Sequence, residues 1–153
     1  QGSVQGSGYP RPYGVRMMDI IVACGKIKVN HPAKARDLYI GQHYALTLEL
    51  AKKWASVENI YIFSAKHGVV SSDTILEPYE QVLQKPGAIS LRELQKQIQN
   101  LSSPIWYLGG RDYLRRLLKL RNDIIAPLQD NKSDFRMGKQ KGQLIRWINE
   151  YNT

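Results

Sequence analysis

The sequence predicts a small three-layer α/β domain with a mainly parallel central sheet. Its 153 residues are enough for one buried core and too few for two ordinary domains. Of these residues, 42% are apolar and 23% are charged, as in globular proteins. Short apolar runs alternate with segments of helical periodicity, which is typical of a parallel sheet covered by helices. No apolar run approaches the roughly 18 residues of a membrane span, so we expect no membrane partner.

The domain is expected to occupy residues 17–153. Residues 1–16 are rich in Gly, Ser and Pro without a period, and their first three residues look like the remnant of a cleaved tag followed by a linker. The single cysteine, Cys24, cannot form an internal disulfide, and no secretory signal opens the chain. These features predict a cytoplasmic protein.

The first half of the domain predicts two parallel strands joined by a helix. Residues 19–24 form a nearly continuous apolar run, typical of a strand buried on both faces. Residues 26–34 are polar and contain a proline, which indicates a loop. Apolar residues then recur at helical spacing over residues 35–54 and predict a helix of about five turns. Residues 59–64 are β-branched and aromatic and predict the second strand, with a loop over residues 65–73.

The second half predicts three helices and two further strands. Ser90 and Glu93 fit a capping box, and Leu91, Leu94 and Ile98 make one apolar stripe behind it. Residues 104–108 predict a third strand, residues 112–120 a helix, residues 122–127 a short edge strand and residues 137–151 the last helix.

Positive charge is concentrated in the C-terminal third. Residues 17–153 contain 20 basic and 13 acidic side chains, and residues 111–146 contain ten basic and four acidic ones. Such a surface suits a polyanion, because phosphate contacts release counterions. A solvated, solubilising face is the competing interpretation. If the partner is DNA, we expect backbone contacts from Arg115, Arg116 and Lys119.

The predicted strands end in residues suited to a ligand site. Ligands of open α/β sheets bind beyond the carboxyl ends of the strands, and glycines there let backbone N–H groups approach a base or a phosphate. The three strands are followed by CGK at residues 24–26, SAKHG at 64–68 and GGR at 109–111. We therefore expect one pocket lined by Cys24, Ser64, Lys66, His67, Gly109 and Gly110.

Several of these side chains are candidates for chemistry, each with a structural alternative. His67 is the first catalytic candidate and is expected to share one cleft with Asp73; the alternative is a loop histidine bonded to backbone. Asp37 is either a base or an acid that stabilises a helix start. Lys66 and Lys26 either hold a phosphate or, if desolvated, act as amine nucleophiles.

The remaining candidates are a tyrosine, two histidines and the cysteine. Tyr79 is either a platform for a base or a core anchor. His31 and His43 have no partners at ligand spacing, so we interpret both as structural. No metal-ligand spacing surrounds Cys24, and neither GxGxxG nor GxxxxGK[ST] occurs, so no metal and no cofactor is expected.

Three short motifs carry a family resemblance. They are ARDLYIG at residues 35–41, SAKHG at 64–68, and Glu77 with the Pro78-Tyr79 pair after it. The chain resembles an uncharacterised bacterial and phage domain family allied to the YaaA peroxide-stress proteins. The resemblance implies a uracil-DNA-glycosylase-like α/β fold, DNA binding, and similarity to anti-phage glycosylases that excise a modified, for example glucosylated, base. The Asp-Pro-Tyr motif of the uracil enzymes is absent where Cys24-Gly25-Lys26 stands, so their catalytic acid has no counterpart here.

The leading hypothesis is therefore a monofunctional DNA N-glycosylase in phage defence. Asp37 or Asp73 would steady the oxocarbenium-like sugar and orient water, and His67 would donate to the leaving base. The flipped base would stack on Tyr39 or Tyr79. The full set expected to bind substrate is Cys24, Gly25, Lys26, Arg36, Tyr39, Ser64, Lys66, Glu77, Tyr79, Gly109, Gly110 and Arg111.

Two other function classes fit the same residues. One is a DNA-binding or nucleotide-sensing protein of the YaaA-like group without catalysis, in which the residues at the strand ends bind a ligand. The other is a hydrolase or transferase for a free modified nucleotide. The basic C-terminal third favours a polymer over a free nucleotide.

Overall fold

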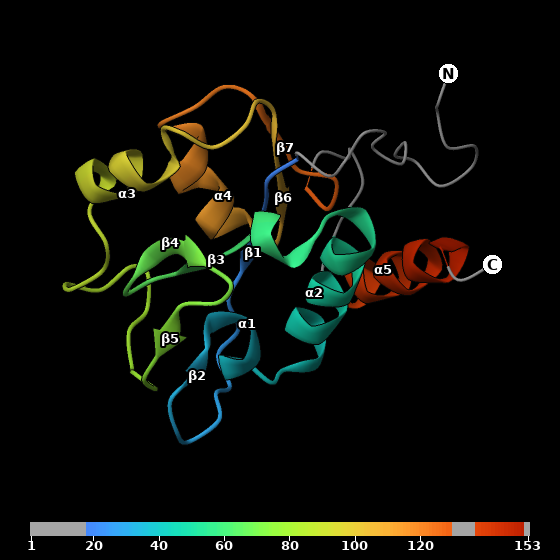
Figure 1. Ribbon diagram of the computed structural model, residues 1–153, viewed down its shortest axis with the longest axis horizontal. Helices are drawn as coiled ribbons and strands as arrows, with labels where there is room; N and C mark the ends of the chain where they lie inside the picture. Colours follow the sequence, from blue (N-terminus) through green and yellow to red (C-terminus); the bar gives the residue numbers. More distant parts are fainter. Residues whose placement is uncertain (1–17, 130–136, 152–153) are drawn as a thin grey trace.

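A five-stranded, mostly parallel sheet forms the centre of the protein (Figure 1). The computed structural model describes residues 18–129 and 137–151. The sheet has the order β4-β3-β1-β6-β7, in which β3, β1, β6 and β7 are parallel and β4 is antiparallel to β3. Its strands are β1 (Ile20–Ala23), β3 (Ile60–Ser64), β4 (Gly68–Ser71), β6 (Ile105–Leu108) and β7 (Ile124–Ile125). The predicted α/β class and parallel sheet are confirmed.

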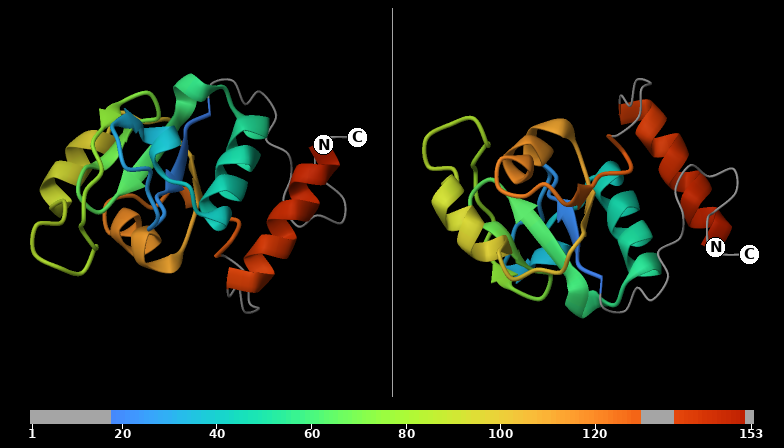
Figure 2. Two further views of the ribbon diagram at one scale, coloured as in Figure 1. Left: turned by 90° about the horizontal axis from the view of Figure 1, so that it is seen from below. Right: turned by 90° about the horizontal axis from the view of Figure 1, so that it is seen from above.

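Helices cover both faces of this sheet (Figure 2). They are α1 (Ala35–Leu38), α2 (Gln42–Trp54), α3 (Leu91–Ile98), α4 (Arg111–Leu118) and α5 (Met137–Tyr151), with a 3-10 turn η2 (Val57–Asn59) and a small ribbon of β2 (Ala33–Lys34) and β5 (Ile75–Leu76). Helices α2 and α5 lie side by side on one face, and α3 and α4 lie on the other.

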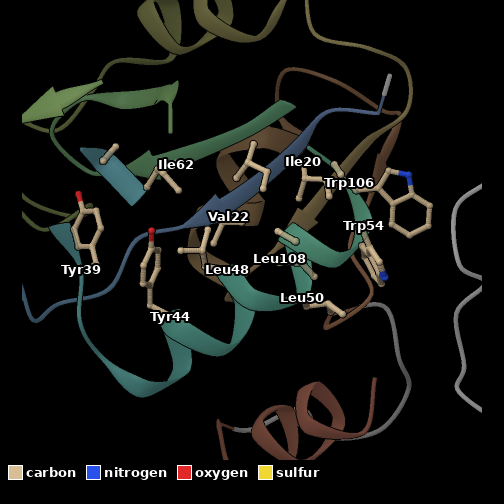
Figure 3. Close-up of a cluster of buried hydrophobic side chains, with 14 of the residues drawn as sticks. Ile20, Val22, Tyr39, Tyr44, Leu48, Leu50, Trp54, Ile62, Trp106 and Leu108 are labelled. Atoms are coloured by element: carbon tan, nitrogen blue, oxygen red, sulfur yellow. The ribbon is translucent and has the colours of Figure 1, made fainter. Parts of the chain in front are cut away.

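Two hydrophobic clusters hold the layers together. Successive side chains of a strand point to opposite faces, so Ile20 and Val22 of β1 join the cluster under α2, whereas Ile21 joins the cluster under α3 and α4. In the first cluster, Trp54 and Trp106 pack near Ile20, at the opposite end from Tyr39 (Figure 3).

The single helix predicted over residues 35–54 is wrong, because the chain forms two helices there. Tyr39 forms an antiparallel bridge with Lys28, and the Ile40 N–H donates to the carbonyl of Ile27. These pairings draw residues 39–40 into extended backbone, and α2 starts afresh after Gly41. Helical spacing of apolar residues does not reveal a partner strand that comes from another part of the chain.

The loop predicted over residues 65–73 contains strand β4. Gly68 has φ +73°, a conformation that L residues rarely adopt, and it turns the chain back so that β4 pairs with β3. The loop predicted over residues 26–34 likewise ends in strand β2, and the remaining predicted elements are found within a residue or two. Ser90 caps α3 by accepting a hydrogen bond from the Glu93 N–H at 3.1 Å, and α5 has the predicted bounds.

Two further expectations concern residues outside the described ranges and the absence of a membrane span. The tag-like segment of residues 1–16 lies outside the described residues, as do Lys132 and Arg136 of the basic third. Of the described helices, none combines the length and apolar character that crossing a bilayer requires.

Candidate functional site

The connections between strands place a topological switch point at β1 and β6. From β1 the chain passes through α1 and α2 to β3 on one side, and from β6 it passes through α4 to β7 on the other side. Taken alone, the parallel strands have the order second-first-third-fourth, a common doubly wound order. In such sheets the ligand binds where the two sets of connections part, beyond the carboxyl ends of the strands.

A cavity of about 820 Å³ lies at this switch point. Its lining comes from the residues at the ends of β1 and β6, the first turns of α2 and α4, and the segment 79–84. Gln129, which follows β7, and Gln140 of α5 complete it. Four cations and two carboxylates line it, together with amides and tyrosines. These charged residues are Lys26, Lys28, Arg111 and Arg115, with Glu80 and Asp112. The volume and this mixture suit a polar, anionic ligand of nucleotide size.

Two consecutive glycines start the cavity wall after β6, for different reasons. A Cβ on Gly109 would lie 2.5 Å from the Ala23 Cβ and 2.5 Å from the Tyr107 hydroxyl, so Gly109 is required by packing. A Cβ on Gly110 would meet nothing within 4 Å. Gly110 precedes α4 without a side-chain cap, and its carbonyl accepts a hydrogen bond from Tyr107.

Tyr79 joins the cavity to the core beneath it. Its ring lines the cavity, and its hydroxyl lies 2.5 Å from that of Tyr39. Burial raises the pKa of Tyr79 to about 12, so the hydroxyl stays protonated. The Lys28 ammonium lies 4.6 Å from the Tyr79 ring centroid. Tyr39 itself is buried and is not part of the lining, so it cannot serve as the expected platform for a base.

Tyr113 and Cys24 meet at the cavity wall. The Tyr113 hydroxyl lies 3.4 Å from the Cys24 Sγ, and its ring packs edge-on against Phe63 at 4.8 Å between centroids. Burial raises the pKa of Tyr113, which keeps this hydroxyl a hydrogen-bond donor at neutral pH. The cavity wall thus carries a protonated hydroxyl.

Asp112 is the better held of the two carboxylates. It lies in the first turn of α4, and its Oδ atoms accept from the Gln84 amide at 3.2 Å and from Arg115 at 3.4 Å. Both carboxylates are exposed, but no ion pair to Glu80 is found among the described residues. The Gln84 amide and the Arg115 guanidinium thus fix the position of the Asp112 carboxylate at the start of α4.

His43 and Gln140 are cavity residues that the sequence did not reveal. The His43 Nε2 and Gln140 Oε1 lie 2.7 Å apart, although 97 positions separate them in the chain. His43 belongs to the first turn of α2 and not to the middle of a long helix, so it reaches the carboxyl edge of the sheet. The prediction of one helix over residues 35–54 placed His43 in mid-helix and so did not reveal its position at the site. Gln140 reaches the site because α5 packs against α2.

The family comparison agrees with the extent of this fold. A profile described as "Family of unknown function (DUF6884)" matches residues 20–149. The chain belongs to this family. No curated protein and no solved structure matches the chain. The match spans both strands at the switch point and both helices that start at the cavity, so the site belongs to the family domain.

In this DUF6884 domain, the expected shared pocket is only partly correct. Cys24, Gly109 and Gly110 line the cavity, but the residues after β3 do not. His67 packs edge-on against Tyr79, with 5.2 Å between ring centroids, and so lies beside the lining. Burial, followed by the nearby Lys66, lowers the pKa of His67, which leaves it neutral at pH 7.

The expected cleft shared by His67 and Asp73 is wrong. Strand β4 separates them, since Ser64 is paired with Gly68 at one edge of the sheet and Tyr61 with Ser71 towards the other. Four strand residues span about 13 Å. Asp73 instead pairs with Arg36, which lowers the pKa of the carboxyl. The exposed Asp37 and Glu77, like Arg36, are also absent from the cavity lining.

The basic C-terminal third is not one surface. Arg121 is folded inward, where it donates to the carbonyls of Ile98, Leu101 and Ser102. Arg116 donates to the Leu83 carbonyl. Lys119 ends α4, roughly 12 Å along the helix from its start at the cavity. Arg115 alone of the three expected DNA contacts lines the cavity.

Within residues 18–129 and 137–151, no group of three or more His, Cys, Asp or Glu side chains is arranged to hold a metal ion.

Proposed function

We propose that the protein is a DNA N-glycosylase, acting in anti-phage defence, that takes a flipped, modified base into the cavity at the switch point and leaves an abasic site. The observation that carries this proposal is the cavity lining itself, in which the Asp112 carboxylate, the Tyr113 hydroxyl and several cations share one space. The doubly wound order of the parallel strands supports a uracil-DNA-glycosylase-like fold and kinship with YaaA-like proteins as parts of the same proposal.

The proposed reaction needs little nucleophilic power. As the bond from sugar carbon to base nitrogen breaks, the sugar gains oxocarbenium character and the base keeps the electron pair. Asp112 stabilises this cation and takes a proton from the water whose oxygen bonds to the sugar carbon. The Tyr113 hydroxyl donates a hydrogen bond to the departing base. Asp112 thus replaces Asp37 and Asp73 in the mechanism, and Tyr113 replaces His67.

Incubation with unmodified and hypermodified phage DNA tests this proposal. We expect abasic sites, detected by alkaline cleavage, and released base, detected by mass spectrometry, from modified DNA only. Asp112→Asn should lower turnover by a factor on the order of 100 or more while DNA binding persists. Tyr113→Phe should lower it by a similar factor, since one donor to developing charge is lost.

Asp37→Asn is the matched control. Like Asp112, it is an exposed aspartate in the first turn of a helix, but it lies outside the cavity lining, so it should retain full turnover. Loss of activity in Asp37→Asn together with an active Asp112→Asn would overturn the assignment of the carboxylate. DNA binding without release of any base would instead favour the non-catalytic DNA-binding or nucleotide-sensing function.

A further inference from the structure

Basic residues follow three of the parallel strands, at the edge of the sheet where the cavity lies. We call this edge the mouth of the cavity. Lys26 follows β1, Lys66 follows β3 and Arg111 follows β6. Because β1 pairs in parallel with both β3 and β6, the carboxyl ends of all three strands meet at one edge of the sheet. Lys26 and Arg111 line the cavity directly. The topology therefore gathers cations that are up to 85 positions apart in the chain.

The Tyr79 ring lies next to Lys66 and to a fourth cation, Lys28. The Lys28 ammonium lies 4.6 Å from its ring centroid, and the Lys66 ammonium lies 5.8 Å from the same centroid. The Lys28 ammonium also donates to the Lys26 carbonyl at 3.1 Å. The ring and this carbonyl hold the lysine heads near the mouth without neutralising their charge.

Within the part of the chain that the structure describes, Lys26, Lys28, Lys66 and Arg111 have no carboxylate partner. Among the described residues, the ion pairs are formed by Lys34, Arg36, Lys96, Arg115 and Arg121. None of those pairs includes Lys26, Lys28, Lys66 or Arg111. An unpaired cation beside a cavity is available to a phosphate, whereas a paired one must first lose its carboxylate.

We infer that Lys26, Lys28, Lys66 and Arg111 form the phosphate-binding surface that holds the DNA backbone around the cavity mouth. The identity of the polymer as DNA rests on the proposed function. This surface differs from the row expected on α4, because Arg116 is bonded to the Leu83 carbonyl and Lys119 lies at the far end of the helix. Backbone contacts at the mouth position the strand so that one base reaches the cavity.

The test measures binding of a fluorescein-labelled 20-nucleotide DNA duplex, and of its single strand, by anisotropy across a series of salt concentrations. The variant replaces Lys26, Lys28, Lys66 and Arg111 with Gln. Its log-log slope of affinity against salt should fall by about 3 to 4 for the duplex, or slightly less for the single strand, because four phosphate contacts are removed. Thermal unfolding checks that the variant is folded.

A second quadruple variant separates position from net charge. It replaces Lys52, Lys53, Lys96 and Arg146 with Gln, so it loses the same charge from residues that do not line the cavity. We expect its salt slope to stay within about 1 of the wild type. Equal losses in the two quadruple variants, or an unchanged slope in the mouth variant, would overturn the inference.

Two further results keep this inference distinct from the proposed function. If Arg116→Gln with Lys119→Gln removes binding and the mouth variant does not, the backbone follows α4 and the mouth surface is wrong. If the mouth variant loses binding but the wild type releases no base from any DNA, the surface stands and the glycosylase proposal fails.

Discussion

At the scale of single residues, Gly109 shows how packing and ligand access differ. Its backbone runs so close to Ala23 and Tyr107 that no side chain fits, and both neighbours are buried. The next residue, Gly110, faces open space. The sequence shows two identical glycines, but only the first is required by the core.

Replacing Gly109 with Ala should therefore destabilise the protein by about 1–3 kcal/mol, the usual cost of overpacking a filled core. Gly110→Ala is the matched control and should cost about 1 kcal/mol or less, because the added methyl group has room and only the N-cap preference for glycine is lost. Urea denaturation of the three proteins measures both effects. Equal stability of the two variants would show that Ala23 or Tyr107 moves aside readily.

At the scale of elements, Arg121 ties the end of α3 to the start of β7. Its guanidinium donates to the carbonyl of the last α3 residue, to two carbonyls after α3, and to both Oδ atoms of Asp123. The Ser103 hydroxyl donates to the same carboxylate at 2.6 Å. The connections around β6 are thus held by a charged pair at the amino-end edge of the sheet, far from the cavity. This basic residue serves the fold and not a polyanion.

This clamp predicts how stability depends on pH. Hydrogen bonds, first from Arg121 and then from Ser103, hold the pKa of Asp123 well below its ordinary value. The unfolded chain therefore binds a proton near pH 3.9 while the folded chain does not. The stabilisation is fully present above that pH and is lost as the pH falls towards the folded pKa.

The free energy of unfolding should consequently decrease below about pH 4, and Asp123→Asn should flatten part of that decrease. Urea denaturation at intervals from pH 7 to pH 2.5 measures it. Asp37→Asn serves as the control, since Asp37 is exposed and no ion pair to it is found among the described residues. An unchanged pH dependence in Asp123→Asn would show that the pair contributes nothing to stability.

At the scale of the whole molecule, three tryptophans join the last helix to the central sheet. Trp54 of α2 packs edge-on against Trp106 of β6, with 5.5 Å between ring centroids, and in a tilted arrangement against Trp147 of α5 at 6.4 Å. Helix α5 therefore covers α2 and completes the core on that face. The same helix supplies Gln140 to the cavity, so the core and the site depend on its docking together.

Trp147→Ala should destabilise the protein by about 3–5 kcal/mol, because it removes a large buried side chain from this stack. Ile145→Ala in the same helix is the control, since Ile145 is 39% exposed and its loss should cost much less. Chemical denaturation followed by far-UV circular dichroism measures both. A small loss for Trp147→Ala would mean that α5 docks independently of the tryptophan stack.

The sequence predicted the site residues that follow strand ends, but not those whose position depends on contacts with distant parts of the chain. Cys24, Gly109 and Gly110 follow buried apolar runs, and parallel strands must bring their carboxyl ends to one edge. Asp73 illustrates the limit of this reasoning. The glycine turn at Gly68 converts a predicted loop into β4, and that strand carries Asp73 away from the cavity.

The sequence by itself determined the fold class, the strands β1, β3 and β6, and the edge of the sheet that carries the site. Burial on two faces, helical periodicity and capping leave local signatures in the residues concerned. Only the tertiary structure decided that residues 39–40 leave the helix, that Arg121 turns inward and that His43 meets Gln140. Each of these depends on a hydrogen-bond partner from a distant part of the chain, and local pattern does not encode the identity of such a partner.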